Sequence, residues 1–567
     1  MESPKPEEKT TALGLLRKVW HHRKLLIIEP LLLCWLLPSC LLIVAVQNLA
    51  LEKACRVNLG YDADVCKSML DKELYGIDCD ALGLTEESNE TMMVNDTPPM
   101  PENITILTDL NHTVCKAEIE TQKQVTYINA IRGPMSSIFP IIVILFAGGW
   151  SDRRGVRKPC MLFPMIGEFA SVIGLLITSI FMDVIPMEFG AIIERVVPSM
   201  LGGQTLMIMG IYSYLTEITE EKDRAFRFGI FAVCANIIQL VGTPFSGTLF
   251  LQLGYVKMYI IGACILLLGI LYLIFFIPEI KKKPKAEETN GNINTTFESG
   301  GKTIATLEID DKKIVLKPKE EAERQKNCLV DFFDPTSAYE CIQIFAKKRA
   351  HNLRTYLILL VILQLLFIAP AIGEADYYYN FQLLQLKWNG EMFSYYNTYS
   401  AALNIVGTFL MTAVLIKFLS LSDSMAGFIA SLGTVISKPL LAFSKEAILY
   451  YVGTTVDLFI SCKAIAVKSI ISNFVETEEL GRLYSVLGIT EALSGFIFPP
   501  LYSQIYSSTI ESFPGAFYLF SEIFLVPTLF IFIAVYIYLR KQKKRNPTDT
   551  PENGIDNPAM EVESTRV

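Results

Sequence analysis

Residues 148–158 read Gly-Gly-Trp-Ser-Asp-Arg-Arg-Gly-Val-Arg-Lys, and this short polar stretch between two long apolar segments decides the fold. Gly148 lets two helices approach closely, and Gly155 permits a tight turn. A carboxylate at a helix end caps the helix or pairs with an arginine. The charged residues of the stretch that we expect to act are Asp152, Arg153, Arg157 and Lys158.

The rest of the chain places this stretch in a lipid bilayer. The 567 residues are 51% hydrophobic, and a membrane span needs about 20 mostly apolar residues. Twelve such segments are predicted, and each is expected to be a helix because lipid offers no partners to backbone polar groups. The predicted spans are residues 25–47, 125–149, 160–182, 189–215, 226–251, 256–278, 354–375, 396–417, 424–443, 447–470, 483–505 and 515–538.

The distribution of Lys and Arg predicts the topology. Basic clusters precede the first span and follow the second, the sixth and the twelfth, so the positive-inside rule places both termini in the cytoplasm. The first apolar run is too long for a cleaved signal peptide and is expected to stay. The predicted organisation is a cytoplasmic tail (1–24), a six-helix half (25–278), a partly disordered linker (279–353), a second six-helix half (354–538) and a cytoplasmic tail (539–567).

A long polar segment, residues 50–124, separates the first two spans and is expected to face outward. It carries four Asn-x-Ser/Thr sequons, and glycosylation there requires exposure on the outer side. It also carries four cysteines, which an oxidising compartment turns into disulfides; three pairings are possible, and spacing does not choose among them. The sequons are Asn89, Asn95, Asn103 and Asn111, and the cysteines are Cys55, Cys66, Cys79 and Cys115.

The pattern Gly-x-x-x-Asp-Arg-x-Gly-x-Arg-Lys, between the second and third spans, resembles the signature of the major facilitator superfamily. The resemblance implies an all-α membrane fold of two pseudo-symmetric six-helix halves, with the substrate site at mid-membrane between them. It also implies that residues 148–158 form a latch, whose charges hold the halves together inside when the outer side is open. Similar stretches after the fourth and tenth spans, residues 219–224 and 477–482, agree with a repeat.

Ionisable residues inside spans are functional candidates, because each costs roughly 2.5–3.5 kcal/mol at a helix centre. Asp457 and Lys468 are eleven residues apart, about 20° off one helical face, so they are expected to line one cavity; snorkelling is the alternative for Lys468. Glu374 and Asp376 close the outer end of the seventh span, where solvation is the alternative. Among the cationic residues inside spans, Arg195 is the leading candidate for a functional role. We expect Arg195 and Lys468 to attract substrate anions, and Glu374, Asp457 or Glu491 to take up protons.

Other residues narrow the mechanism. The four histidines lie outside the spans, which excludes a histidine proton relay at mid-membrane. Glu194 points about 100° away from Arg195 on a helix, so the two need not pair. A dense aromatic group forms either an interfacial belt or a stacking platform for a planar solute. Its members are Tyr377, Tyr378, Tyr379, Trp388, Tyr395, Tyr396 and Tyr399.

Further stretches are similar to solute carrier family 46, which includes the proton-coupled folate transporter: residues 28–30, residues 373–376 with Trp388 following, and residues 478–485. By this resemblance Arg195 matches the family's fourth-span arginine, and Lys468 stands where the family has a substrate-linked arginine. The folate transporter's acidic and histidine coupling positions fall on Gly203, on Ala232 and near Ala371, which places folate–proton symport in doubt. Other members carry muropeptides, cyclic dinucleotides or drug catabolites, often at lysosomal membranes.

The sequence therefore predicts a secondary active transporter of a small, anionic organic solute that works by alternating access, with folate-like or muropeptide-like substrates and with protons as the coupling ion. An uncoupled facilitator, or a receptor that uses the glycosylated segment, is the alternative. The tail Thr565-Arg566-Val567 fits a class I PDZ ligand. No enzyme, cofactor, metal or nucleic-acid partner is expected. The expected location is the plasma membrane, with a lysosomal or endosomal membrane as the alternative.

Overall fold

A computed structural model gives the fold of the chain. It describes residues 27–72, 79, 102–154, 156–219, 224–279, 306–309, 312–315, 353–419, 421–472 and 477–545. Some predictions lie outside these residues: the sequons at Asn89 and Asn95, Gly155, most of the linker, the first tail and the PDZ-type ending.

Apolar helices make up almost all of the described chain. Those before the linker are α2 (Glu29–Lys53), η2 (Ala54–Asn58), α3 (Ala63–Leu70), α5 (Glu102–Arg154), α6 (Lys158–Ile180), α7 (Met187–Met200), α8 (Gly203–Ile218), α9 (Arg224–Gly242) and α10 (Pro244–Phe275). Those after it are α14 (Leu353–Glu374), α15 (Tyr378–Gln385), α16 (Gly390–Phe409), η6 (Leu410–Phe418), α17 (Asp423–Ala442), α18 (Ala447–Val456), α19 (Cys462–Ser472), α20 (Thr477–Thr509) and α21 (Ala516–Arg545).

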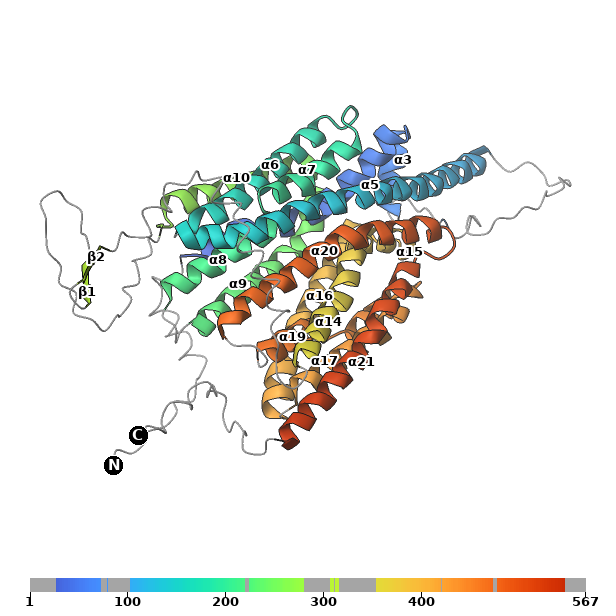
Figure 1. Cartoon of the computed structure of the whole chain (residues 1–567). Coiled ribbons are helices and arrows are strands. Elements are labelled where there is room, and N and C mark those ends of the chain that lie inside the picture. Colours follow the sequence, from blue (N-terminus) through green and yellow to red (C-terminus); the bar gives the residue numbers. More distant parts are fainter. Residues whose placement is uncertain are drawn as a thin grey trace, which may run out of the picture.

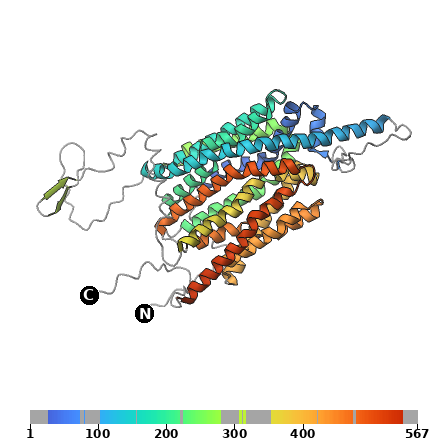
Figure 2. The same cartoon turned by 45° about the vertical axis from the view of Figure 1, so that its right-hand side comes forward.

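The helices form two bundles that lie side by side (Figure 1). Helices α2–α10 form the first bundle, around a core that includes Leu31, Met165 and Tyr259. Helices α14–α21 form the second bundle, around cores that include Leu360 and Phe532. The turned view shows the same arrangement, with α5 of the first bundle alongside α20 of the second (Figure 2). The one pair of strands in the described residues, β1 (Thr306–Ile309) and β2 (Lys312–Val315), forms an antiparallel hairpin in the linker.

Helical residues overlie each of the twelve predicted spans. Within the described residues, seven helices are long and apolar enough to cross a membrane. Several other spans are interrupted, which shortens their helices: Gly202, with φ of 95°, separates α7 from α8, and a turn at residues 457–461 separates α18 from α19. The predicted boundary between the fifth and sixth spans coincides with a kink at Gly254.

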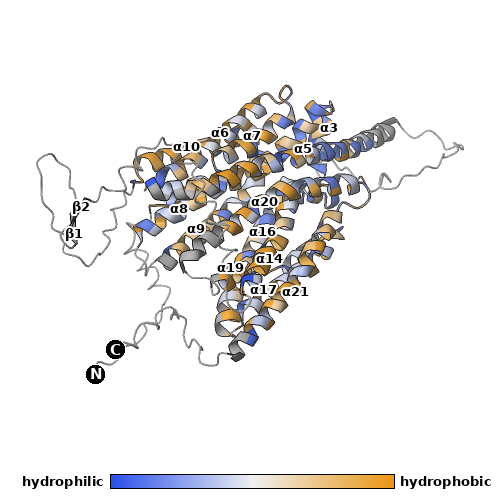
Figure 3. Ribbon diagram, viewed as in Figure 1, coloured by the Kyte–Doolittle hydropathy of each residue, from blue (hydrophilic) through white to orange (hydrophobic). Residues whose placement is uncertain are grey.

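Hydrophobic residues occur along the helices of both bundles (Figure 3), and many large apolar side chains are exposed. Phe275, Ile448 and Phe530 are 76%, 74% and 66% exposed. Soluble proteins rarely expose apolar surface on this scale. Where such a surface occurs, it marks a contact with a membrane or with another protein. Together with the apolar helices it indicates that the bundles sit in lipid.

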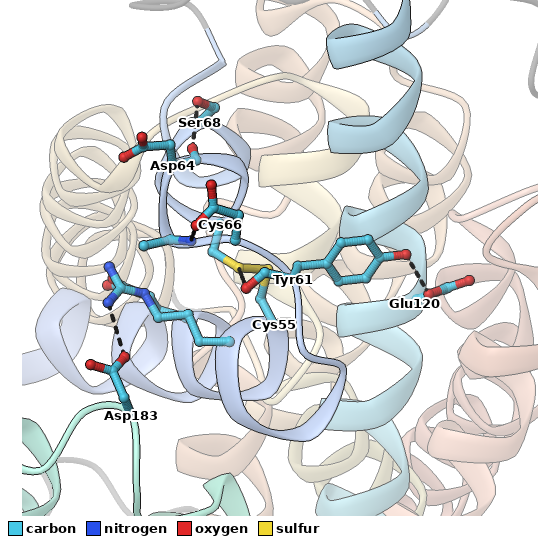
Figure 4. Close-up of a disulfide and its surroundings, with 11 residues drawn as sticks. Cys55, Tyr61, Asp64, Cys66, Ser68, Glu120 and Asp183 are labelled. Carbon is cyan, nitrogen blue, oxygen red and sulfur yellow. Dashed lines mark hydrogen bonds and ion pairs between the residues drawn. A yellow bond between two sulfur atoms is a disulfide. The ribbon is translucent and has the colours of Figure 1, made fainter.

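The cysteines of the outer segment pair as Cys55–Cys66 and Cys79–Cys115. We call the end of the bundles that carries both bonds the disulfide end. There, the Tyr61 hydroxyl donates to Glu120 at 2.7 Å (Figure 4), and burial together with this carboxylate raises the pKa of Tyr61 to about 12. The outer segment is therefore fastened to α5.

Candidate functional site

Charged side chains from both bundles meet at the disulfide end. Asp376, in the turn between α14 and α15, accepts from Arg195 Nη2 of α7 at 2.8 Å and from Arg132 Nη2 of α5 at 3.3 Å. Glu194 accepts from Arg132 Nη1 at 2.5 Å and from Arg195 Nε at 3.4 Å. We call these four residues the gate cluster. Because Asp376 belongs to the second bundle and the other three to the first, the cluster joins the bundles.

Neutral hydrogen bonds extend this junction along α5 and α20. The Ser503 hydroxyl donates to the carbonyl of Thr126 at 2.8 Å, and the Tyr506 hydroxyl donates to Gln122 Oε1 at 2.8 Å. Gln122 Nε2 donates to the carbonyl of Asn380 at 3.2 Å. All these groups are buried, so the bundles are sealed against each other at the disulfide end.

Helices α10 and α16 meet on the other side of the same end. The backbone N–H of Gly247 donates to the Ser394 hydroxyl at 2.9 Å. A Cβ at Gly247 would lie 2.5 Å from the carbonyl oxygen of Gly390, so only glycine allows this approach. The Tyr379 hydroxyl also donates to Asn48 of α2 across the junction.

A cavity of about 170 Å³ lies within the second bundle, between α16, α17, α18 and α21. One face of α16 contributes Asn397, Ser400 and Asn404, whose spacing of three and four residues places them on one side of a helix. The charged residues of its lining are Lys438 and Asp457. The cavity therefore carries one cation, one carboxylate and several neutral polar groups in a partly apolar lining.

Three polar atoms of the lining are buried and, within the described part of the chain, have no hydrogen-bond partner: Asn397 Nδ2, Asn404 Oδ1 and Ser437 Oγ. A buried polar atom without a partner costs about 1–3 kcal/mol. Such atoms gathered on one cavity indicate that a solute or water satisfies them. They supply both a donor and acceptors.

Lys438 connects the cavity to a buried carboxylate behind it. Its Nζ donates to Glu374 Oε2 at 2.5 Å, and Glu374 is fully buried. Glu374 also accepts from the hydroxyls of Tyr378, at 2.5 Å, and Ser521. Lys438 Nζ lies 5.3 Å from the centre of the Tyr518 ring, a cation–π distance.

The second charged group of the cavity has its own partners. Asp457 Oδ1 accepts from the Thr434 hydroxyl at 2.6 Å, and Lys463 Nζ lies 2.6 Å from the same hydroxyl oxygen. Asp457 is the residue that follows the last turn of α18, and Lys463 is the second residue of α19. The interruption at residues 457–461 thus places a carboxylate and an ammonium group around one threonine.

Aromatic rings form the wall of the cavity nearest the disulfide end. Tyr378, Tyr396, Tyr450 and Tyr518 line it. The Tyr450 and Tyr518 hydroxyls are 2.8 Å apart, and the Tyr396 and Tyr450 rings are 5.0 Å apart. The rings pack mainly against one another, and whether they also stack on a planar solute stays a prediction.

The opposite end, which we call the latch end, carries residues 148–158. Arg157 donates through Nη1 to Ser151 at 2.7 Å and pairs with Glu217 at 2.9 Å, both in the first bundle. Its backbone N–H donates to Glu279 at 2.6 Å. The Lys158 ammonium donates to the carbonyl of Ile274. The structure places Gly148, Asp152 and Arg153 in α5 without describing their side chains.

The predicted site residues separate into groups. Arg195 belongs to the gate cluster, where it pairs with both Asp376 and the adjacent Glu194. Glu374 and Asp376 are buried, with exposures of 0% and 7%, so the solvated alternative is wrong. Their charged partners, Lys438, Arg132 and Arg195, come from helices distant in sequence.

The expectation that Asp457 and Lys468 share a face is also wrong. The helix is interrupted at residues 457–461, so a regular rotation of 100° per residue does not apply between them. Asp457 lines the cavity, whereas Lys468 and Glu491 are exposed and are not among its lining residues. Their role in transport stays a prediction.

Sequence reasoning missed several residues of these sites. Arg132 and Lys438 are ionisable residues inside predicted spans, so the rule that selected Arg195 would have found both. The spacing of Asn397 and Asn404 was also available, but polar amides in a span do not by themselves distinguish a cavity from a helix contact. Among the described residues, no group of His, Cys, Asp and Glu fits a metal.

Comparison with known proteins identifies this architecture. Residues 124–499 match the model of the Major Facilitator Superfamily. A probable peptidoglycan muropeptide transporter of solute carrier family 46 from Drosophila melanogaster is 19% identical over 87% of this chain and 82% of its own length. The lysosomal proton-coupled steroid conjugate and bile acid symporter of Mus musculus is 22% identical over 72% and 79%. Member 2 of the same solute carrier family from Canis lupus familiaris is 23% identical over 71% and 79%.

Solved structures agree on the fold. The human organic anion transporter MFSD10 covers 90% of this chain and 99% of its own, at 13% identity and a TM-score of 0.50. A D-xylose–proton symporter covers 90% and 97%, at 10% identity and a TM-score of 0.51.

Proposed function

The chain belongs to the major facilitator superfamily and is a multi-pass membrane protein that transports small organic solutes; from this premise we propose that its solute is an organic anion, moved by alternating access and coupled to protons. The observation that carries the proposal is the cavity of the second bundle. It combines Lys438 with the unpartnered polar atoms of Asn397, Asn404 and Ser437. An anionic group with hydrogen-bonding neighbours satisfies all of them.

The sealed disulfide end supports alternating access. The gate cluster and the neutral contacts along α5 and α20 join the bundles at that end. If the disulfide end faces outward, as the positive-inside rule predicts, this arrangement is inward-facing. In that state the latch of residues 148–158 has no need to hold the bundles, which agrees with Arg157 pairing inside the first bundle.

The size and lining of the cavity support a solute with one anionic end and a ring system. Its volume of about 170 Å³ is below the roughly 300–1,000 Å³ of typical small-molecule sites. It therefore holds one end of a larger solute, with the remainder between the bundles. Muropeptides and bile acids, which the names of its relatives mention, and folates all carry an anionic group on a larger scaffold.

The remaining assignments are proposals of the same kind. We retain residues 25–278 and 354–538 as the two halves, residues 279–353 as the cytoplasmic linker, and both termini as cytoplasmic. We propose no enzymatic activity. The plasma membrane is the proposed location, and a lysosomal membrane is the alternative that the mouse relative's name suggests.

The test is uptake by cells that display the full chain at their surface. Radiolabelled folate, a muropeptide and taurocholate are offered at acidic and at neutral pH. We expect saturable, acid-stimulated uptake of at least one, lost in Lys438→Gln. Saturable uptake that ignores pH would favour an uncoupled facilitator. Absence of uptake of all three, with surface display verified, would overturn the proposed substrate class and favour a receptor.

A further inference from the structure

Two carboxylates that serve different clusters lie on one turn at the end of α14. The backbone N–H of Tyr377 donates to the carbonyl of Glu374 at 2.9 Å, which closes a turn that includes Asp376. We call the charged residues in and behind the cavity, Glu374, Lys438, Asp457, Lys463 and Glu522, the cavity cluster. Glu374 binds Lys438 within this cluster, whereas Asp376 binds Arg195 of the gate cluster. The turn is thus the direct covalent link between the two clusters.

The packing leaves this turn little freedom. A Cβ at Gly373 would lie 2.4 Å from the ring of Tyr502, so the ring sits directly against the backbone before the turn. The Tyr502 hydroxyl lies 2.7 Å from the Ser521 hydroxyl, which donates to Glu374. A change in what holds Glu374 is therefore passed to the backbone that carries Asp376.

Lys438 stands between the cavity and Glu374. Lys438 lines the cavity, whereas Glu374 does not and is fully buried behind it. One ammonium group therefore faces two anions in competition: the Glu374 carboxylate, which holds it in this structure, and the anionic group of a solute in the cavity.

The charge of the surrounding cluster favours uptake of a proton. Two lysines, Lys438 and Lys463, face three carboxylates, which belong to Glu374, Asp457 and Glu522. The Oε1 atom of Glu522 is buried and has no hydrogen-bond partner within the described residues. The titratable groups that interact with Glu374 come from every element around it: Lys438 of α17, Tyr378 of α15, Asp457 after α18, Lys463 of α19, Tyr502 of α20 and Glu522 of α21. With all charged groups ionised the cluster carries one excess negative charge, so one proton balances it.

We propose that the turn from Glu374 to Tyr377 couples the proton and the solute to the gate, an inference that rests on the proposed function. A proton binds the Glu374 carboxylate, the Lys438–Glu374 ion pair breaks, and Lys438 pairs with the anionic group of the solute. The net charge of the cluster together with its solute is unchanged by this step, because one proton enters with each anionic group. Loss of the ion pair loosens the turn, and Asp376 then separates from Arg132 and Arg195 as the disulfide end opens.

The reverse order describes release. When Glu374 loses its proton, its carboxylate takes Lys438 from the solute, and the turn regains its anchor. Asp376 is then held against the guanidinium groups of the first bundle, as in this structure. Proton loss, solute release and closure of the disulfide end thus belong to one event.

The test measures the opening of the disulfide end in the absence of any solute. Ser503→Cys places a thiol in the sealed junction, where Ser503 is 4% exposed, and Ser508→Cys places a reference thiol on the exposed part of the same helix. The full-length chain in lipid nanodiscs is labelled with a maleimide at acidic and neutral pH, with the unsubstituted chain subtracted as background. The ratio of the two rates removes the effect of pH on thiol reactivity.

The proposal expects a low ratio at neutral pH that rises roughly tenfold at acidic pH, the effect of one charged hydrogen bond. Glu374→Gln, which mimics the protonated state, is expected to keep the ratio high at both pH values. Lys438→Gln breaks the same ion pair from the other side, so it is expected to do the same and replaces Glu374→Gln if that variant fails to fold.

A ratio that ignores pH in the parent chain, or a Glu374→Gln variant that behaves like the parent, would overturn the proposal. Loss of the pH response in Glu522→Gln with a normal response in Glu374→Gln would also overturn it and assign the proton to Glu522. A correct labelling pattern with no uptake of the offered solutes would leave the coupling intact and reject only the substrate class. Acid-stimulated uptake, combined with a labelling ratio that does not change with pH, would leave the substrate class intact and reject the coupling through this turn.

Discussion

At the disulfide end, Asp376 of the second bundle binds Arg132 and Arg195 of the first. At the latch end, a comparable pair, Glu29 with Arg227, stays inside the first bundle. The side chains are of the same types, and Arg132 and Arg227 are both buried, whereas Arg195 is about half exposed. What differs is whether the pair crosses between bundles, and only a crossing pair can hold a gate closed.

A buried ion pair therefore has two separate uses in this fold, depending on whether it lies within one bundle or crosses between the two. Within a bundle it stabilises helix packing, and its loss costs stability in every conformation. Between bundles it stabilises one conformation over another, and its loss shifts an equilibrium. The same substitution is therefore expected to have different consequences at the two ends.

Asp376→Asn is expected to have the largest effect. Removing one partner of a buried ion pair costs about 3–5 kcal/mol, here in the closed state alone, so the closed state loses roughly a hundredfold or more in population. Labelling of Ser503→Cys measures the shift. Glu29→Gln is the matched control: we expect a lower melting temperature with unchanged labelling. Equal labelling in both variants would remove the distinction between the ends.

Lys438→Gln is expected to come next, through loss of a charged hydrogen bond to the solute worth about 1.5–3 kcal/mol. Uptake is expected to fall roughly 10- to 100-fold. The matched control is Lys468→Gln, because Lys468 is exposed and away from the cavity; it should retain most uptake. A larger loss in Lys468→Gln would return the anion site to the position that the sequence indicated.

Asn404→Ala tests the unpartnered amide of the cavity. The loss of one neutral hydrogen bond to the solute costs about 1 kcal/mol, so we expect KM to rise about fivefold while maximal uptake stays within twofold. A fall in maximal uptake with unchanged KM would place Asn404 in the conformational change instead.

The sequons are expected to have the smallest effect on transport. Replacing Asn89, Asn95, Asn103 and Asn111 by Gln should reduce the apparent mass on gels, because glycans are lost, and should leave uptake per surface molecule unchanged. The linker carries a fifth Asn-x-Ser/Thr sequon at Asn294, which should carry no glycan if the linker is cytoplasmic. A glycan at Asn294 would reverse the assigned orientation and turn the sealed end inward.

Much of the fold follows from local sequence. Hydropathy locates spans because each helix must cover itself with apolar side chains in lipid, and helices overlie every predicted segment. The disulfide pairing did not follow, because loop lengths permit each alternative. Cys55 pairs with Cys66 because η2 and α3 place them together.

The site was harder to predict, because its contacts join helices that are distant in sequence. Composition marks Glu374 as an unusual residue in a span, but only packing brings it against Lys438, 64 residues later. Asp457 illustrates a second limit: the interruption of its helix changes the face on which Lys468 lies. Helical periodicity is reliable only while the helix is continuous.

The most direct test is a reversible cross-link between cysteines placed at Thr126 and Ser503, whose contact seals the disulfide end. Uptake is measured before cross-linking, after it and after its reversal, with each single-cysteine variant treated in parallel. If the bundles must separate at this end for the solute to pass, uptake stops with the link and returns when the link is cleaved. Uptake that continues through the cross-linked protein would show that the disulfide end is not the gate.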